Sequence, residues 1–157
     1  MKILAIGDVV SSQGCDYLRD NLPKLKREHQ ADFVIVNGEN SAVGNGITPK
    51  SAQHIFNSGA DVITLGNHSL RRPEIVDFLD ENEFIIRPCN YHSSAPGNGS
   101  VILDKGKNRV AIINLQGAVY LDNIINPFDS IDDEIKKVKD DGANIIVIDF
   151  HAEATGE

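Results

Sequence analysis

The chain has 157 residues, of which 41% are hydrophobic and 24% charged, and its formal net charge is −8 at pH 7. This length fits one domain with a sizeable core, and the composition is that of an ordinary soluble globular protein. The negative charge argues against DNA or an anionic membrane as a partner. It leaves a small phosphorylated ligand open, because bound cations can reverse the local field.

Cysteine usage and hydropathy predict a cytoplasmic protein. Cys15 and Cys89 lie in no Cys-x-x-Cys or Cys/His zinc pattern, so we expect free thiols. The amino terminus runs into an apolar segment without a signal peptide, and no apolar run approaches the ~18 residues of a membrane-spanning helix. The carboxyl end, HAEATGE, directly follows an apolar run without a covering helix. We therefore expect residues 1–157 to be the N-terminal part of a single domain.

The first ninety residues alternate predicted strands and helices. The segment GITPKSAQHIFNSGA, residues 46–60, reads as a helix with Thr48 as N-cap, Pro49 at the first helical position and Gly59 just past the end. Pro23 should kink or interrupt an earlier helix. Strands are expected at 2–7, 32–37, 61–65 and 83–88, and helices at 14–29, within 46–60 and from Pro73.

The second half begins with a predicted hairpin, because strands at 100–104 and 109–115 flank the turn KGKN. A helix follows, capped by Asp129 or Ser130 and ended by Gly142, and a last strand is expected at 144–150. Strands separated by helices predict an α/β fold with a mostly parallel sheet and right-handed crossovers.

Polar residues follow four of the apolar runs. The carboxyl ends of parallel strands form the ligand edge of such sheets, so we expect these side chains to converge on one edge. Taken singly, each residue has an ordinary explanation as a helix cap, a turn residue or a satisfied histidine, and only their joint placement favours a site. The residues are Asp8, Glu39, Asn40, Asn67, His68 and His151.

These oxygen and imidazole donors suit divalent Mn, Fe or Zn about equally. Glu39 is the candidate to bridge two ions, because a carboxylate has two oxygens and Asn40 adjoins it. Two such ions would activate a water molecule and hold a phosphate ester. His68, next to Asn67, could then protonate the leaving oxygen.

Seven motifs occur along the chain in the order GDVV, NGEN, GITPK, TLGNHS, RPCNY, INLQG and IDFHAEAT. With them the chain resembles the YmdB-like branch of the calcineurin-like metallophosphoesterases over its whole length, and NGEN and DFHAEAT are the most distinctive. The resemblance implies an α/β/β/α sandwich, incomplete at its carboxyl end, with the hairpin and the last strand in the second sheet.

The resemblance further implies a bacterial two-metal phosphodiesterase acting on 2′,3′- or 3′,5′-cyclic mononucleotides. Two divalent ions, Fe, Mn or Zn, would be its cofactors. By position, Asp8 and Asn40 match ligands of the first metal, Asn67 and His151 ligands of the second, Glu39 the bridging ligand and His68 the general acid.

Two departures from the family pattern affect this prediction. The family carries a GTHTH-like segment further along, whose two histidines complete the metal sites, and this chain ends before it. After GNH the family usually has Thr-Trp-Asp, where this chain has Ser69-Leu70-Arg71. The sheet strands that would follow are also absent, which predicts either a homo-oligomer formed through the open sheet edge or a marginally stable fold.

Two other functions stay open. The segment HSLRR suggests a phospho-ligand-binding or regulatory protein with impaired catalysis, because Arg71 and Arg72 could hold a phosphate without cleaving it. A plain nucleotide-binding α/β domain is disfavoured, because GDVVSSQG contains neither G-x-G-x-x-G nor the lysine of a phosphate loop.

Overall fold

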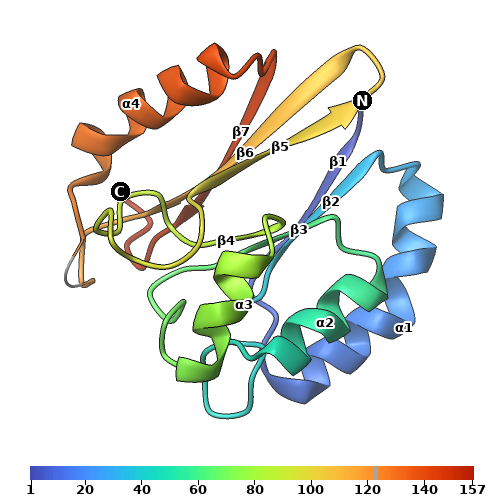
Figure 1. The fold of residues 1–157 in the computed structure, drawn as a ribbon. Helices are drawn as coiled ribbons and strands as arrows, with labels where there is room; N and C mark the ends of the chain where they lie inside the picture. Colours follow the sequence, from blue (N-terminus) through green and yellow to red (C-terminus); the bar gives the residue numbers. More distant parts are fainter. Residues whose placement is uncertain (122–123) are drawn as a thin grey trace.

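The computed structural model describes residues 1–121 and 124–157 and contains two stacked sheets with helices on their outer sides (Figure 1). Its elements are β1 (Ile3–Ile6), α1 (Ser11–His29), β2 (Phe33–Asn37), α2 (Pro49–Ser58), β3 (Val62–Thr64), the 3-10 turn η1 (Pro73–Ile75), α3 (Val76–Glu81), β4 (Ile85–Ile86), β5 (Ser100–Lys105), β6 (Asn108–Gln116), α4 (Pro127–Asp140) and β7 (Ile145–His151).

The first sheet has the order β1-β2-β3-β4 with all strands parallel. The second has the order β5-β6-β7, where β5 and β6 form the expected hairpin and β7 runs parallel to β6. Helices α1, α2 and α3 lie outside the first sheet and α4 lies outside the second (Figure 1). This confirms the α/β/β/α sandwich and places the hairpin and the last strand in the second sheet.

Helix α2 has the ends that its sequence predicts. The Thr48 side chain accepts a hydrogen bond from the Ser51 N–H at 3.2 Å, and Ser51 Oγ accepts one from the Thr48 N–H at 3.0 Å. This reciprocal capping box satisfies two donors at the helix start, and Pro49 occupies the first helical position. Gly59, with φ 112°, ends the helix in the left-handed region.

The predicted start of helix α1 is wrong, because the helix begins at Ser11 rather than Gly14. The helix also continues through Pro23, so the proline does not interrupt it. Its buried side chains Leu18 and Leu22 precede the proline, Leu22 directly, and pack on the first sheet. This packing stabilises the helix through the point where one backbone hydrogen bond is lost.

Helix α4 begins at Pro127, so the predicted cap at Asp129 or Ser130 is wrong. The side chain of Asn126 accepts a hydrogen bond from the Phe128 N–H at 2.9 Å. An asparagine cap followed by proline is the stronger start signal, because proline lacks an N–H that would need a partner. Strand β4 covers two residues of the predicted 83–88.

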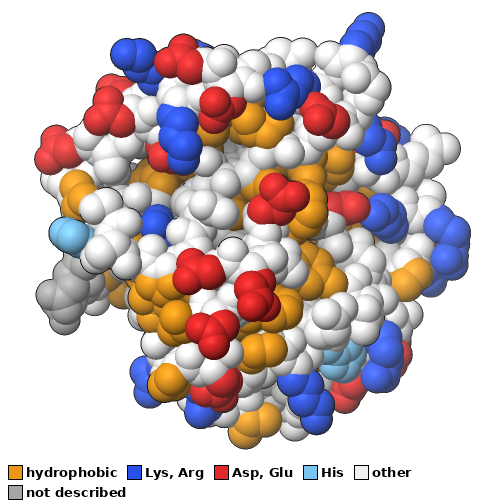
Figure 2. Space-filling model, viewed as in Figure 1, with side chains coloured by type: hydrophobic (Ala, Val, Ile, Leu, Met, Phe, Trp, Pro, Cys, Tyr) orange, Lys and Arg blue, Asp and Glu red, His pale blue; other side chains and the backbone are white. Residues whose placement is uncertain are grey.

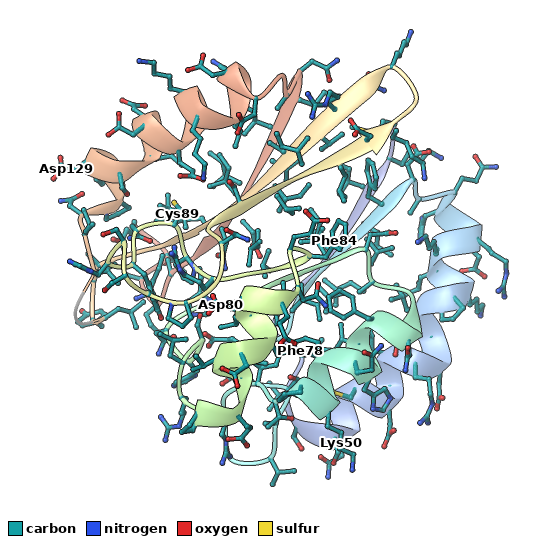
Figure 3. The ribbon with its side chains drawn as sticks, in the orientation of Figure 1. Lys50, Phe78, Asp80, Phe84, Cys89 and Asp129 are labelled. Carbon is teal, nitrogen blue, oxygen red and sulfur yellow. The ribbon has the colours of Figure 1, made fainter. Side chains whose placement is uncertain are left out.

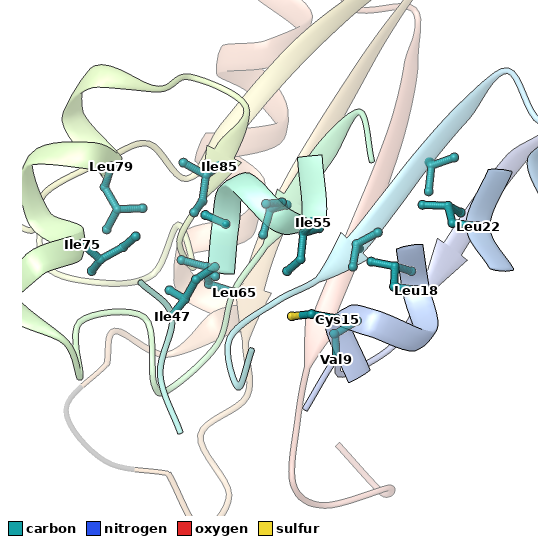
Figure 4. Packing of buried hydrophobic residues seen from close by; sticks show 14 residues of the cluster. Val9, Cys15, Leu18, Leu22, Ile47, Ile55, Leu65, Ile75, Leu79 and Ile85 are labelled. Carbon is teal, nitrogen blue, oxygen red and sulfur yellow. The ribbon is translucent and has the colours of Figure 1, made fainter. Parts of the chain in front are cut away.

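Three apolar clusters fill the gaps between the layers. The largest joins the first sheet to α1, α2 and α3, where side chains such as Leu22, Ile55 and Leu79 are fully buried (Figure 4). A second lies between the sheets and a third beneath α4. Figure 3 shows Lys50 at the start of α2 and Asp129 on α4, on opposite outer sides of the molecule.

The gap between the sheets changes from apolar to polar toward the carboxyl ends of the strands. Alternate residues of a strand share a face, and Phe33 and Ile35 of β2 belong to the cluster between the sheets. Asn37 is the next residue on that face. By the same alternation the last inward residues of β3, β6 and β7 are polar; they are Thr64, Gln116 and His151, with Asn114 and Asp149 one layer below.

Acidic side chains gather over α3 on the face shown in Figure 2, and basic side chains lie mainly toward the rim of this face. This distribution fits the negative net charge.

No helix within residues 1–121 and 124–157 has both the length and the apolar character needed to cross a membrane. Cys15 and Cys89 are free thiols, as expected.

Candidate metal centre

The carboxylate of Glu39 is the centre of the candidate site. Its side chain is only 2% exposed. Its Oε1 lies 3.0 Å from Asn40 Nδ2, 3.2 Å from His68 Nδ1 and 3.5 Å from His151 Nε2. Its Oε2 accepts a hydrogen bond from the backbone N–H of His68 at 3.0 Å. Residues from three separate segments therefore meet at one buried carboxylate.

Asp8 joins this group through Asn40. Asn40 Nδ2 donates to both carboxylate oxygens of Asp8, at 3.0 and 3.1 Å. The other amide atom, Oδ1, lies 2.8 Å from His68 Nδ1. Asn40 thus connects the ends of β1 and β2 with the imidazole that follows β3.

His151 reaches the site from the second sheet, as the last residue of β7. The four polar strand ends therefore do not share one edge of a single sheet, as the strand pattern predicted, but converge from two sheets. His151 Nε2 lies 2.9 Å from Asn67 Oδ1. The stacking of the sheets brings His151 and Asn67 together across 84 residues of sequence.

Gly66 allows this close approach. A Cβ at this position would lie 2.3 Å from Glu39 Oε2 and 2.5 Å from the His151 ring. Both distances are shorter than any normal contact, so any side chain here would displace Glu39 or His151. The glycine is thus required by the space that the site occupies.

Hydrogen bonds to backbone carbonyls fix the turn that carries Asn67 and His68. The Gly66 carbonyl accepts from Tyr91 Oη at 2.8 Å and from Ser69 Oγ at 2.5 Å. Burial raises the pKa of Tyr91 above its usual value, which keeps its hydroxyl protonated and able to donate. Asn114 Nδ2 donates to the Leu65 carbonyl at 2.8 Å.

In the segment Ser69-Leu70-Arg71, which departs from the family pattern, the structure explains the first two residues by their burial and packing. Ser69 is fully buried, and Leu70 packs against the cluster beneath α1, α2 and α3. Arg72 donates to the carbonyls of Val43 and Asn45 at 2.5 and 3.0 Å, and so holds the loop that follows Asn40. Arg71 is exposed.

The donor set fits a hard or borderline divalent cation. In the described part of the chain, the ion pairs of Glu39 involve only histidines. A buried carboxylate needs compensating positive charge, which a cation held between the strand ends would supply. His, Cys, Asp and Glu alone form no group of three arranged for a metal within residues 1–121 and 124–157. The candidate set therefore depends on the amide oxygens of Asn40 and Asn67.

Several residues of the site were not found by sequence reasoning. Gly66, Tyr91 and Asn114 lie in the motifs TLGNHS, RPCNY and INLQG, but no role was predicted for them. The inward-facing strand positions contained a signal that could have indicated such residues. Polar residues at these positions interrupt the run of apolar side chains on the buried face of a strand.

Comparison with known proteins supports the family resemblance. The sequence profile of YmdB-like proteins matches residues 4–157. A Bacillus subtilis protein named 2′,3′-cyclic-nucleotide 2′-phosphodiesterase is 43% identical over the whole chain, which spans 59% of that protein. A crystal structure of a hypothetical protein from Thermus thermophilus superposes with a TM-score of 0.89 at 32% identity, covering 100% of this chain and 60% of its own.

A second crystal structure, of a novel phosphatase from Mycoplasma pneumoniae, also gives a TM-score of 0.89, at 31% identity. The match covers 99% of this chain and 57% of that chain. The chain thus spans somewhat over half the length of these relatives.

Proposed function

The chain belongs to the YmdB-like family, and from this premise we propose that the protein is a metal-dependent phosphodiesterase with a dinuclear centre that hydrolyses cyclic mononucleotides. The observation that carries the proposal is the convergence of two imidazoles and an amide within 3.5 Å of Glu39 Oε1. The name of the Bacillus subtilis relative supports cyclic nucleotides as the substrate class.

The proposed ligands divide into two groups that share Glu39. Asp8 and Asn40 lie on one side, joined by hydrogen bonds, and Asn67 and His151 lie on the other. When bound, two divalent ions would supply the positive charge that activates water and stabilises a phosphate undergoing attack. Fe, Mn and Zn all fit these donors.

The orientation of the Asn40 amide connects metal binding with the role of His68. A ligand role requires Oδ1 of Asn40 to face the carboxylates, where Nδ2 lies in the structure. Turning the amide over would place its N–H groups beside His68 Nδ1, which would then accept a hydrogen bond. The proton of a neutral His68 would reside on Nε2, from which it can pass to a leaving oxygen.

A second candidate function is binding of a phosphorylated ligand without efficient cleavage. The observation that favours it is Arg71, which is exposed beyond the turn carrying His68. The companion cation proposed for this role, Arg72, instead donates to the loop carbonyls of Val43 and Asn45. With Arg72 held in this way, the arginine pair is a weaker phosphate site than the sequence indicated.

The first measurement is the metal content of the protein, purified without chelators, by elemental analysis. About two equivalents of Mn, Fe or Zn per chain would support the dinuclear centre. A content near zero in both the 157-residue chain and the natural full-length gene product would contradict it. A content near zero in the 157-residue chain alone would mean that further residues complete the centre.

The activity test compares Glu39→Gln with the parent protein on 2′,3′- and 3′,5′-cyclic nucleotides. The substitution keeps the side-chain shape but removes the charge, so we expect bound metal and turnover to fall at least ~100-fold while circular dichroism is unchanged. Glu28→Gln on exposed α1 is the matched control and should retain both. Unchanged turnover in Glu39→Gln would refute the assignment, and tight nucleotide binding without product over hours would favour the second function.

A copy-to-copy contact through β7 is a further part of the proposal. Among the described residues, β7 pairs with β6 on one side and lies at the edge of the second sheet. Ile148 and Phe150 of this strand are 41% and 39% exposed. Exposed apolar residues on an edge strand favour pairing with another chain. A concentration-independent monomer by sedimentation would contradict this expectation.

A further inference from the structure

Four polar residues form a layer between the sheets, directly beneath the candidate metal centre. Asn37 of β2 is in register with Thr64 of β3, and Asn114 of β6 is in register with Asp149 of β7. Alternation along each strand directs all four toward the opposite sheet. Thr64 and Asn114 are fully buried. Burying polar groups here would destabilise the fold unless they were hydrogen-bonded, so their partners matter.

The layer is joined across the gap by directional bonds. Thr64 Oγ1 of the first sheet donates to the Asp149 carboxylate of the second. In the opposite direction, Asn114 Nδ2 donates to the carbonyls of Leu65 and Ile86, at 2.8 and 3.0 Å. Apolar contacts further down do not fix direction, whereas these hydrogen bonds specify how the two sheets are aligned.

The Thr64–Asp149 bond links the two segments that meet in the centre. Thr64 ends β3, and Asn67 and His68 follow in the turn after it. Asp149 lies two residues before His151 on the same face of β7. The bond is thus one layer away from the 2.9 Å contact between His151 and Asn67.

The close packing around His151 leaves no room for its side chain to move. The position of a Cβ on Gly66 is already filled by the His151 ring and the Glu39 carboxylate. A slide of β7 relative to β3 would therefore move His151 against Gly66 or away from Asn67. Metal–ligand distances vary by only about 0.2 Å, so either movement would weaken a site that uses both residues.

We propose that Thr64 and Asp149 are a positioning pair, which holds His151 at the place where it can share a cation with Glu39 and Asn67. The inference rests on the metal centre proposed above and adds two residues that are themselves not ligands. Neither residue needs to contact substrate. Their effect is to align one sheet with the other at the level of the site.

The test is calorimetric titration of the metal-free protein with Mn²⁺, together with thermal unfolding. Thr64→Val keeps the side-chain shape but removes the hydroxyl, and we expect Mn²⁺ affinity to fall about 10- to 100-fold. Thr64→Ser restores the hydroxyl and should bind within about threefold of the parent. This rescue separates the bond from general packing.

A matched control removes a comparable bond elsewhere. Ser100 Oγ of β5 donates to Glu134 Oε1 of α4 at 2.5 Å, on the outer side of the second sheet. Ser100→Ala loses a hydroxyl–carboxylate bond and some stability, but its Mn²⁺ affinity should be unchanged. An equal loss of affinity in Ser100→Ala and Thr64→Val would overturn the positioning role.

The remaining outcomes are also decisive. Parent-like affinity in Thr64→Val would overturn the inference while leaving the metal centre intact. If neither the 157-residue chain nor the full-length gene product binds Mn²⁺, Fe²⁺ or Zn²⁺, the proposed centre fails and the inference fails with it. If Thr64→Val does not fold, Asp149→Asn replaces it, because this change keeps the volume and weakens the same bond; parent-like affinity there overturns the inference.

Discussion

Substitution of Gly66 by alanine tests the geometry of the site with a single methyl group. The new Cβ would lie 2.3 Å from Glu39 Oε2 and 2.5 Å from the His151 ring. Ordinary contacts of a Cβ begin at 3.4 Å, so one or both side chains must retreat by about 1 Å. Glu39 cannot retreat without losing the 3.0 Å bond from the His68 N–H.

The expected effect on stability is moderate and the effect on metal binding is large. Overpacking by one methyl group typically costs about 1–3 kcal/mol. For a domain of this size that corresponds to a fall in Tm of roughly 2–12 °C. A displacement of ~1 Å exceeds the tolerance of metal–ligand distances several-fold, so we expect Mn²⁺ to bind at least ~100-fold more weakly.

Gly7→Ala is the control, because it also adds a methyl group to the glycine before a proposed ligand, Asp8. Nothing lies within 4 Å of the added Cβ. Calorimetric Mn²⁺ titration and thermal unfolding of both variants measure the two effects separately. Parent-like Mn²⁺ affinity in Gly66→Ala would show that Glu39 and His151 do not share a cation beside this glycine, and would refute the reasoning.

Two further predictions concern residues outside the proposed ligand set. Arg72→Lys loses the forked donor that holds the carbonyls of Val43 and Asn45, so the loop should be cleaved faster by protease, whereas Arg71→Lys should behave as the parent. Burial raises the pKa of the Cys89 thiol to about 11, above its ordinary 9.0. Because the folded pKa lies above the unfolded one, the stability that this thiol contributes is present below the unfolded pKa of 9.0 and is lost as pH rises from there through about 11. Urea unfolding at pH 8 and pH 10.5 should show this loss in the parent and a smaller one in Cys89→Ala; equal losses would contradict it.

The proposed ligands could be found in the sequence because strand ends have a recognisable pattern. Short apolar runs such as Phe33–Val36 end abruptly in Glu39 and Asn40, which are poor strand formers. The structure brings these residues within hydrogen-bonding distance of His68 and Asp8. Local pattern sufficed for this, because the end of a strand is a local property.

The division into two sheets could not be obtained from the strand pattern. β7 follows a helix, just as β2 and β3 do, so periodicity alone predicts one parallel sheet. The pairing of β7 with β6 depends on contacts distant in sequence, and the family resemblance supplied it. The predicted start of α4 was wrong for a different reason. Asn126, which caps this helix, lies before the acidic run on which the prediction was based.

The three glycines before proposed ligands show how one sequence pattern can have several physical causes. A Cβ on Gly38 would lie 2.8 Å from Ile55 and 3.0 Å from Ile63, so close packing of α2 on the sheet excludes one there. A Cβ on Gly66 would meet Glu39 and His151, so the site itself excludes it. Gly7 has open space. Alanine should therefore destabilise the fold at position 38, weaken metal binding at position 66 and do neither at position 7. The sequence shows the glycine at all three positions, but only the three-dimensional surroundings separate a requirement of the core from a requirement of the site.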